Sequence, residues 1–252
     1  MSLLTEAKVE FNKIVQKNNL QLENIEIDAV GLSPEEAIGD PDRKDFPLLQ
    51  GEEVMIEARF QSYRGQAFTD HPGKFSGSLK EILELKLDNN YHRALFVATV
   101  NAVLRSLDLV EKTVHCRDNQ MEDCVREMIA HVKSQHPDIE QIGIIGFQPA
   151  LLEAAADEPG TDNVLITDLN QERIGSKKYG VKILDGNNQT EYLIAESDFV
   201  LSTGSTLVNN TARDLLNLFA RYRRDYAFYG NTITGLAYLL DLPQLCFYGQ
   251  KG

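Results

Sequence analysis

Residues 142–147 read IGIIGF, an entirely apolar run that ends in Gly146 and Phe147. Such a run is typical of a strand buried on both faces of a parallel sheet. Further short apolar runs follow it at 163–170, 181–184, 198–203, 225–230 and 244–249. Helical patterns lie between several of them, at 149–156, 211–222 and 233–240. Strands that alternate with helices predict an α/β fold with a Rossmann-like, doubly wound parallel sheet.

The first half of the chain has a different pattern. Alternating apolar residues predict strands, and stripes of apolar residues predict helices, with a polar loop at 33–53. The strands are expected at 25–32, 53–60 and 64–70, and the helices at 1–18, 76–85 and 89–110. We therefore expect two domains: a small N-terminal α+β domain over 1–110 and a Rossmann-like domain over 111–252.

The composition narrows the classes of partner. The 252 residues contain 38 acids and 25 Lys and Arg, a net charge of −13, which argues against nucleic acid and against anionic membranes. No apolar run reaches the roughly 18 residues of a membrane span. The start of the sequence lacks a signal peptide, and three cysteines do not make a disulfide framework, so we expect a cytoplasmic protein.

Ligands of open α/β sheets bind beyond the carboxyl ends of the strands, so the residues that follow each apolar run are candidates. After the first run, Gly146 and Phe147 form a turn that could admit a phosphate, or a plain strand-to-helix turn. After the second, Asp168 could accept hydrogen bonds from a ribose or cap its own loop, and Asn170 lies beside it.

The segment 202–211, STGSTLVNNT, is the strongest candidate. Small polar residues crowd between a buried strand and a helix, where they could cradle an oxyanion or serve only as a capping loop. Asn209, Asn210 and Thr211 are expected to cap the helix, and Gly204 to leave the backbone open to a ligand. The candidates here and in the similar segment 229–235 are Thr203, Gly204, Ser205, Thr206, Asn209, Thr211 and Thr232.

Two further features lie outside these strand ends. His115 and Cys116 carry donor atoms that suit soft metals and are the candidate metal ligands, whereas Cys124 falls on an apolar helix face, as a core residue would. Asn101 is a lone amide in the apolar stretch FVATVNAVL. Because a buried amide needs partners, Asn101 is expected to bond to the other half of the chain or to a ligand.

The chain resembles the "putative heavy-metal chelation" family of bacteria and archaea, whose function is not settled. The stretches that carry the resemblance are ATVNA (98–102), GIIGFQPALL (143–152), TDLNQERIG (167–175), DFVLSTGSTLVNNT (198–211) and YGNTITG (229–235). The resemblance implies an enolase-type N-terminal domain joined to a Rossmann-like domain, a cleft between them, and metal chelation. A transition-metal ion is then the candidate cofactor. Gly230-Asn231-Thr232 departs from the Gly-Pro-Thr expected in many members.

Three functions remain open on the sequence. The protein could bind a metal ion or a small anionic ligand in the interdomain cleft. It could instead be an enzyme for a small anionic or nucleotide-like substrate, with 202–211 as the oxyanion cradle, although no nucleophile or base is evident. It could also be a non-catalytic interaction domain. The sequence allows a homo-oligomer and does not determine the oligomeric state.

Overall fold

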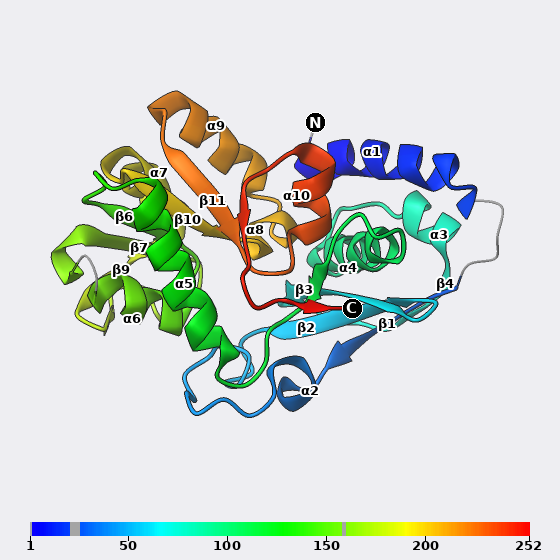
Figure 1. The fold of residues 1–252 in the computed structure, drawn as a ribbon, viewed down its shortest axis with the longest axis horizontal. Coiled ribbons are helices and arrows are strands. Elements are labelled where there is room, and N and C mark those ends of the chain that lie inside the picture. Colours follow the sequence, from blue (N-terminus) through cyan, green and yellow to red (C-terminus); the bar gives the residue numbers. More distant parts are fainter. Residues whose placement is uncertain (1, 21–25, 158–159) are drawn as a thin grey trace.

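The computed structural model describes residues 2–20, 26–157 and 160–252 of the protein. In this part of the chain, a four-stranded antiparallel sheet lies beside a seven-stranded, mostly parallel one (Figure 1). The mixed α/β fold predicted from the sequence is therefore confirmed. The division of the chain at residue 110 stays a prediction.

The antiparallel sheet comes from the N-terminal half. In spatial order its strands are β3 (Tyr63–Thr69), β2 (Val54–Phe60), β1 (Glu26–Leu32) and β4 (Phe75–Ser78). Helix α4 (Asn90–Ser106) packs across β2 and β3, and α1 (Leu3–Lys17) and α3 (Leu79–Glu84) lie on its far side (Figure 1). Residue 25, the first of a predicted strand, lies outside the described residues.

The seven-stranded sheet is wound in two directions from its centre. Its order is β12 (Gln244–Leu245), β11 (Asp225–Tyr229), β10 (Phe199–Thr203), β6 (Ile142–Ile145), β7 (Val164–Asp168), β9 (Val181–Asp185) and β8 (Lys177–Lys178). All neighbours are parallel except β8 and β9. The winding reverses between β6 and β10, so the carboxyl ends of these two strands flank the topological switch point.

Helices cover both faces of this sheet. One face carries α5 (Gln120–Gln135) and α6 (Pro149–Asp157), and the other carries α7 (Gly186–Glu196) and α9 (Ala212–Tyr222) (Figure 1). A short two-stranded ribbon joins β5 (Lys112–Val114) to β13 (Gln250–Lys251). No helix of the described residues is both long enough and apolar enough to cross a membrane.

The hydrophobic cores beside the two sheets each contain residues from both halves of the chain. Buried residues of α8 (Ser205–Val208) and α10 (Thr234–Leu240), among them Leu207 and Leu236, join the cluster formed around α4. In return, Phe46 and Met55 from the first half are buried in the cluster of α5 and α6. Each half therefore completes the core of the other.

The structure differs from the elements predicted from the sequence at several short helices and strands. The expected loop 33–53 begins with α2 (Pro34–Ile38), which the Ser33–Glu36 capping box and Pro34 in the first turn start. The helix expected over 76–85 begins later, at Leu79, behind a capping box of Ser78 and Glu81. Strand β4, which was not predicted, occupies the residues before it. Helix α7 was also missed, because its sequence, GNNQTEYLIAE, has a weak apolar stripe with two buried residues, Leu193 and Ile194.

Candidate functional site

The switch point itself is filled by the protein. Gly146 has a φ of +91°, and a Cβ there would lie 2.5 Å from Cγ2 of Thr203, so only glycine fits the turn. The buried Tyr229 hydroxyl donates to the carbonyl of Gly146 at 3.0 Å. Burial raises the pKa of Tyr229, so its phenol stays protonated. Gly146 and Thr203 thus have a packing role, and a ligand-binding role for them stays a prediction.

Asp168, at the end of β7, ties two strand ends together. One carboxylate oxygen accepts from the backbone N–H of Phe147 and the other from that of Asn170, each at 2.7 Å. The guanidinium of Arg173 lies 3.7 Å from the same carboxylate and over the Phe147 ring, 4.7 Å from its centroid. The expected strand-end acid is therefore present, and it bonds to backbone groups of its own fold.

Two acids that directly precede β2 lie near this strand end. Glu52 accepts from the guanidinium of Arg173 and, at 2.6 Å, from the side-chain amide of Asn170. Glu53 follows it in sequence, half-buried, and its carboxyl group makes no hydrogen bond or ion pair with the described residues. We call these residues the junction cluster, which comprises Glu52, Glu53, Phe147, Asp168, Asn170 and Arg173.

The electrostatics of the junction cluster are dominated by Glu53. Burial first, and then the negative charges of Asp168, Glu52 and Asp70, raise the pKa of Glu53 from 4.5 to about 7, against the opposing effect of Arg173. Near neutral pH this carboxyl group therefore exchanges readily between its charged and neutral forms. Groups perturbed by burial and by a specific charge partner are candidates for function.

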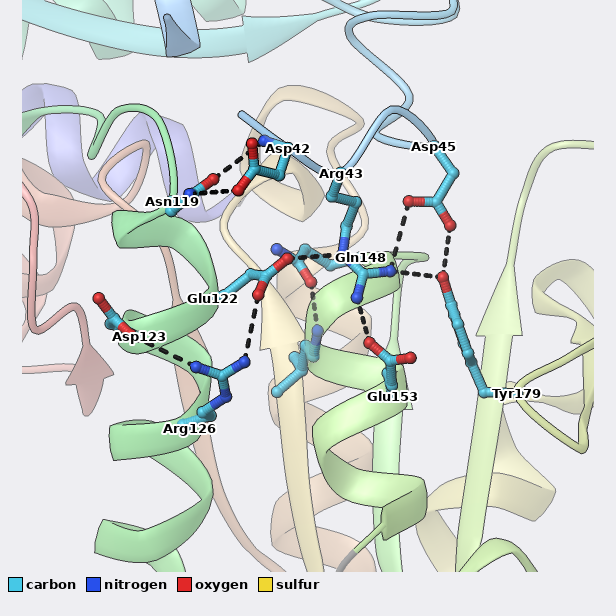
Figure 2. A network of polar contacts seen from close by, with 11 residues as sticks. Asp42, Arg43, Asp45, Asn119, Glu122, Asp123, Arg126, Gln148, Glu153 and Tyr179 are labelled. Atoms are coloured by element: carbon cyan, nitrogen blue, oxygen red, sulfur yellow. Dashed lines mark hydrogen bonds and ion pairs between the residues drawn. The ribbon is translucent and has the colours of Figure 1, made fainter. Parts of the chain in front are cut away.

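Arg43 anchors the segment that leads to Glu52 and Glu53. Figure 2 shows its guanidinium among Glu122 of α5, Glu153 of α6 and Tyr179. It donates to the Tyr179 hydroxyl at 2.6 Å and pairs with Glu153, while Tyr179 donates to Asp45. Only 14% of the Arg43 side chain is exposed. This contact fastens the loop after α2 to the second half of the chain and so positions the start of β2.

Segment 202–211 uses most of its donors internally. The N–H of Gly204 donates to the Tyr229 carbonyl, and that of Ser205 to the Thr203 hydroxyl. The Thr206 hydroxyl donates to the Thr203 carbonyl, and the Thr211 N–H to that of Thr206. These bonds close α8, a short helix that the sequence reading missed.

One expectation for this segment is wrong, and another stays a prediction. No side chain of Asn209, Asn210 or Thr211 caps α9, because Thr211 occupies the N-cap in a helical conformation and Asn210 is left-handed at φ +59°. A Cβ at Gly204 would lie 3.1 Å from the backbone N of Ile233, and a ligand-binding role for Gly204 stays a prediction. The missing side chain of Gly204 lets the backbone at Ile233 pack closely against it.

Asn101 and Thr232 belong to a buried polar hub between the halves. The Asn101 amide donates to the carbonyls of Gln66, Asn231 and Thr232 at 3.0–3.2 Å and accepts from the N–H of Gly235 at 2.7 Å. The Thr232 hydroxyl accepts from a backbone N–H of β3 at 3.1 Å. The expected partner of Asn101 is therefore the other half of the chain, and its amide is fully used there.

The candidate metal ligands lie between β5 and α5. His115 Nδ1 is 2.6 Å from the Cys116 carbonyl oxygen, which can only accept a hydrogen bond. Nδ1 therefore carries the proton and has no lone pair free to bind a metal ion. Cys116 is buried, as is Cys124, and all three cysteines are free. Among the described residues, no three His, Cys, Asp or Glu side chains are gathered around a common metal position.

Two cavities lie away from the predicted residues. One of about 370 Å³ between α5 and α6 is lined by Arg43, Glu122 and Glu153. The other, of about 730 Å³, lies at the start of α4 beside His71 and Tyr91. The expected cleft between two domains stays a prediction.

Sequence reasoning missed Glu52, Glu53, Arg173 and Tyr229. Arg173 stands in the stretch TDLNQERIG, which begins in the apolar run 163–170, and Tyr229 lies inside the run 225–230. Glu52 lies more than 100 residues from its partners Asn170 and Arg173, and Glu52 and Glu53 end the stretch that was expected to be a polar loop. Nothing local in the sequence indicates that contact.

The fold and its strand ends define a class: a two-sheet α/β protein whose Rossmann-like half carries polar residues at the carboxyl ends of its strands. Residues 130–240 match the model of the DUF364 family, described as "Putative heavy-metal chelation", which confirms the resemblance seen in the sequence. No curated protein matches the chain.

Two solved structures are similar to the chain to different degrees. A DUF364 protein of unknown function from Pyrococcus horikoshii has a TM-score of 0.51 and 18% identity, over 91% of this chain and 79% of that one. A DUF364 protein of unknown function from Desulfitobacterium hafniense DCB-2 has a TM-score of 0.44 and 16% identity, over 74% and 72%. The likeness to the Pyrococcus protein shows a shared fold. The enolase-type character of the N-terminal half stays a prediction.

Proposed function

We propose that this protein binds a divalent metal ion at the junction cluster, with the Glu53 carboxylate as its main protein ligand. The observation that carries the proposal is that Glu53 has no partner of its own among the described residues, although three acids surround it. Chelation of metal ions is also what the description of the matching family suggests.

The charges favour a cation over an anion. In the part of the chain that the structure describes, Glu52, Glu53 and Asp168 face one guanidinium, that of Arg173. Glu52 and Asp168 already accept hydrogen bonds, so Glu53 is the group left to neutralise. A bound cation would offset the repulsion that raises the pKa of Glu53. The alternative of an oxyanion cradle in 202–211 has less support, because those donors bond within the protein.

A single free carboxylate is compatible with such a site. Hard divalent ions such as Mg²⁺ are often held by one or two carboxylates and keep several waters, so a closed cage of protein ligands is not required. When bound, the ion would supply positive charge for an oxygen-bearing ligand or substrate. Asn170 and Arg173 would orient Glu52 beside it, and Asp168 would hold the two strand ends in place.

The test is calorimetric titration with Mn²⁺, a hard ion that prefers oxygen ligands. The wild type is compared with Glu53→Gln and with Glu10→Gln, which alters an exposed acid on α1. We expect binding by the wild type and by Glu10→Gln, and its loss in Glu53→Gln. Equal affinity in Glu53→Gln, or no binding by the wild type, would refute the proposal.

A further inference from the structure

The cavity at the start of α4 has a buried cation in its wall. The cavity has a volume of about 730 Å³, and Arg93 of the first turns of α4 lines it. Arg93 is 9% exposed, and its guanidinium forms no ion pair with an acid of the described residues. A buried charge without a counter-charge is costly, so the arrangement favours an anion in the cavity.

The guanidinium of Arg93 is held by three neutral acceptors. Its Nε donates to the carbonyl of Val208 in α8 at 2.5 Å, and its terminal nitrogens donate to the Leu87 carbonyl and to the side-chain oxygen of Asn90. An arginine side chain has five N–H groups. Two of them are therefore left without a partner in the part of the chain that the structure describes. A planar guanidinium with free N–H groups matches the oxygen atoms of a phosphate group.

The first turn of α4 adds further donors. The side chain of Asn89 caps the helix by accepting from the N–H of His92 at 2.8 Å. The N–H groups of Asn90 and Tyr91 come before the first intrahelical hydrogen bonds and so have no acceptor within the helix. The positive end of the helix dipole lies here as well, and the exposed Lys74 also lines the cavity.

Two acids act on Arg93 and have hydrogen-bond partners of their own. Asp70 accepts from the side-chain amide of Asn90 at 2.6 Å. Asp88, which lines the cavity, accepts from the side-chain amide of Asn89 at 3.0 Å. Burial lowers the pKa of Arg93 in spite of the raising effect of both acids. A bound anion would offset this cost of burying the guanidinium.

Tyr91 forms an aromatic part of the cavity wall. Its hydroxyl donates to the carbonyl of Lys74 at 2.7 Å, and a Cβ at Gly73 would lie 2.3 Å from its ring. The half-buried ring is therefore held in place beside the donors of Arg93. The cavity has the size of a small-molecule site and is larger than a phosphate ion alone requires.

We propose that this cavity binds a small organic molecule through its phosphate group. The phosphate accepts hydrogen bonds from the two remaining N–H groups of Arg93 and from the first turn of α4, and Lys74 adds positive charge. The organic part lies against the ring of Tyr91. This site lies beyond the function proposed for the junction cluster, because it takes an anion and none of its residues belongs to that cluster.

The first experiment is calorimetric titration with phenyl phosphate, with a chelator present so that no metal ion takes part. The wild type should bind phenyl phosphate more tightly than inorganic phosphate and should not bind phenol. Lys74→Glu should weaken the binding of phenyl phosphate by about tenfold. Lys80→Glu is the matched control, since it makes the same change of charge at an exposed lysine of α3 that does not line the cavity. No binding by the wild type, equal affinity for inorganic phosphate, or equal losses in the two variants would overturn the proposal.

A third variant tests the guanidinium itself. Arg93→Lys keeps the charge but loses the planar fork of donors, so its affinity for phenyl phosphate should fall as well. Its circular dichroism spectrum checks that it is folded. An unchanged affinity in Arg93→Lys would refute the assignment of the phosphate to Arg93.

The second experiment needs no variant and so is unaffected by any folding defect. The folded wild type is acetylated at its lysines with and without phenyl phosphate, and the peptides that contain Lys74 and Lys80 are quantified by mass spectrometry. Phenyl phosphate should protect Lys74 and leave Lys80 as reactive as before. Equal modification of Lys74 under both conditions would contradict binding in this cavity.

Discussion

Replacing Glu53 by Gln should stabilise the protein above neutral pH and change little in acid. A carboxyl group whose pKa is higher in the folded than in the unfolded state binds an extra proton on folding. Its contribution to stability therefore falls as pH rises from about 4.5 to about 7, the ordinary and the folded pKa of Glu53, and is then constant. Glutamine keeps the shape of the neutral form and lacks this loss.

The size of the effect follows from the shift in pKa. Each unit is worth about 1.4 kcal/mol, so a rise from 4.5 to about 7 corresponds to about 3 kcal/mol. Glu53 is half-buried, and residual solvent makes a value of about 2 kcal/mol the better expectation.

Denaturant unfolding at pH 5 and at pH 8.5, with a chelator present, measures this difference. The free energy of unfolding of Glu53→Gln should exceed that of the wild type by clearly more at pH 8.5 than at pH 5. Glu10→Gln, which alters an exposed ion pair with Lys13, should show no such divergence. A difference between wild type and Glu53→Gln that is the same at both values of pH would show that folding does not raise the pKa of Glu53.

Three further substitutions test the scaffold. Asn101→Ala should cost about 3 kcal/mol in urea unfolding, because it leaves several buried groups unpaired, and a loss below about 1 kcal/mol would contradict the hub. Gly146→Ala should destabilise the protein clearly more than Gly175→Ala. Gly175 has a similar φ, +84°, but a Cβ there would meet no atom within 4 Å. Equal losses of stability would show that the contact with Thr203 does not matter. The strain at Gly175 alone should cost about 1–2 kcal/mol. Arg43→Met should lower stability by about 2 kcal/mol and speed proteolysis between α2 and β2, whereas unchanged cleavage would refute the anchor.

The parallel sheet could be predicted because its signal is local. Apolar runs such as IGIIGF are buried by helices on both faces, and Gly146 ends its strand in a turn that only glycine fits. Helix α2 also has a local signal, since Ser33, Pro34 and Glu36 form the capping box and first turn that start a helix. Helix α7 could not be predicted, because only Leu193 and Ile194 of its mostly polar sequence are buried and they do not form a clear apolar stripe.

The candidate site was predicted only in part, for two physical reasons. Asp168 and Asn170 follow an apolar run and could be placed from the sequence. Glu52 and Glu53 could not, because the contact of Glu52 with Asn170 joins distant segments. In 202–211 the residue types were recognised, but composition does not tell where a donor points. The same small polar side chains that could hold an anion also close the tight turns of α8.

The exchange of core residues between the halves has a consequence for cooperativity. The surface of α4 is buried by Leu207, Phe228 and Leu236, and that of α5 and α6 by Phe46 and Met55. Unfolding of either half would therefore expose apolar surface of the other half to water. The chain should therefore lose its structure in one transition, without a stage in which one sheet survives alone. The two sheets are not modules that recombination could exchange freely, because a new partner would need to supply the same interlocking side chains.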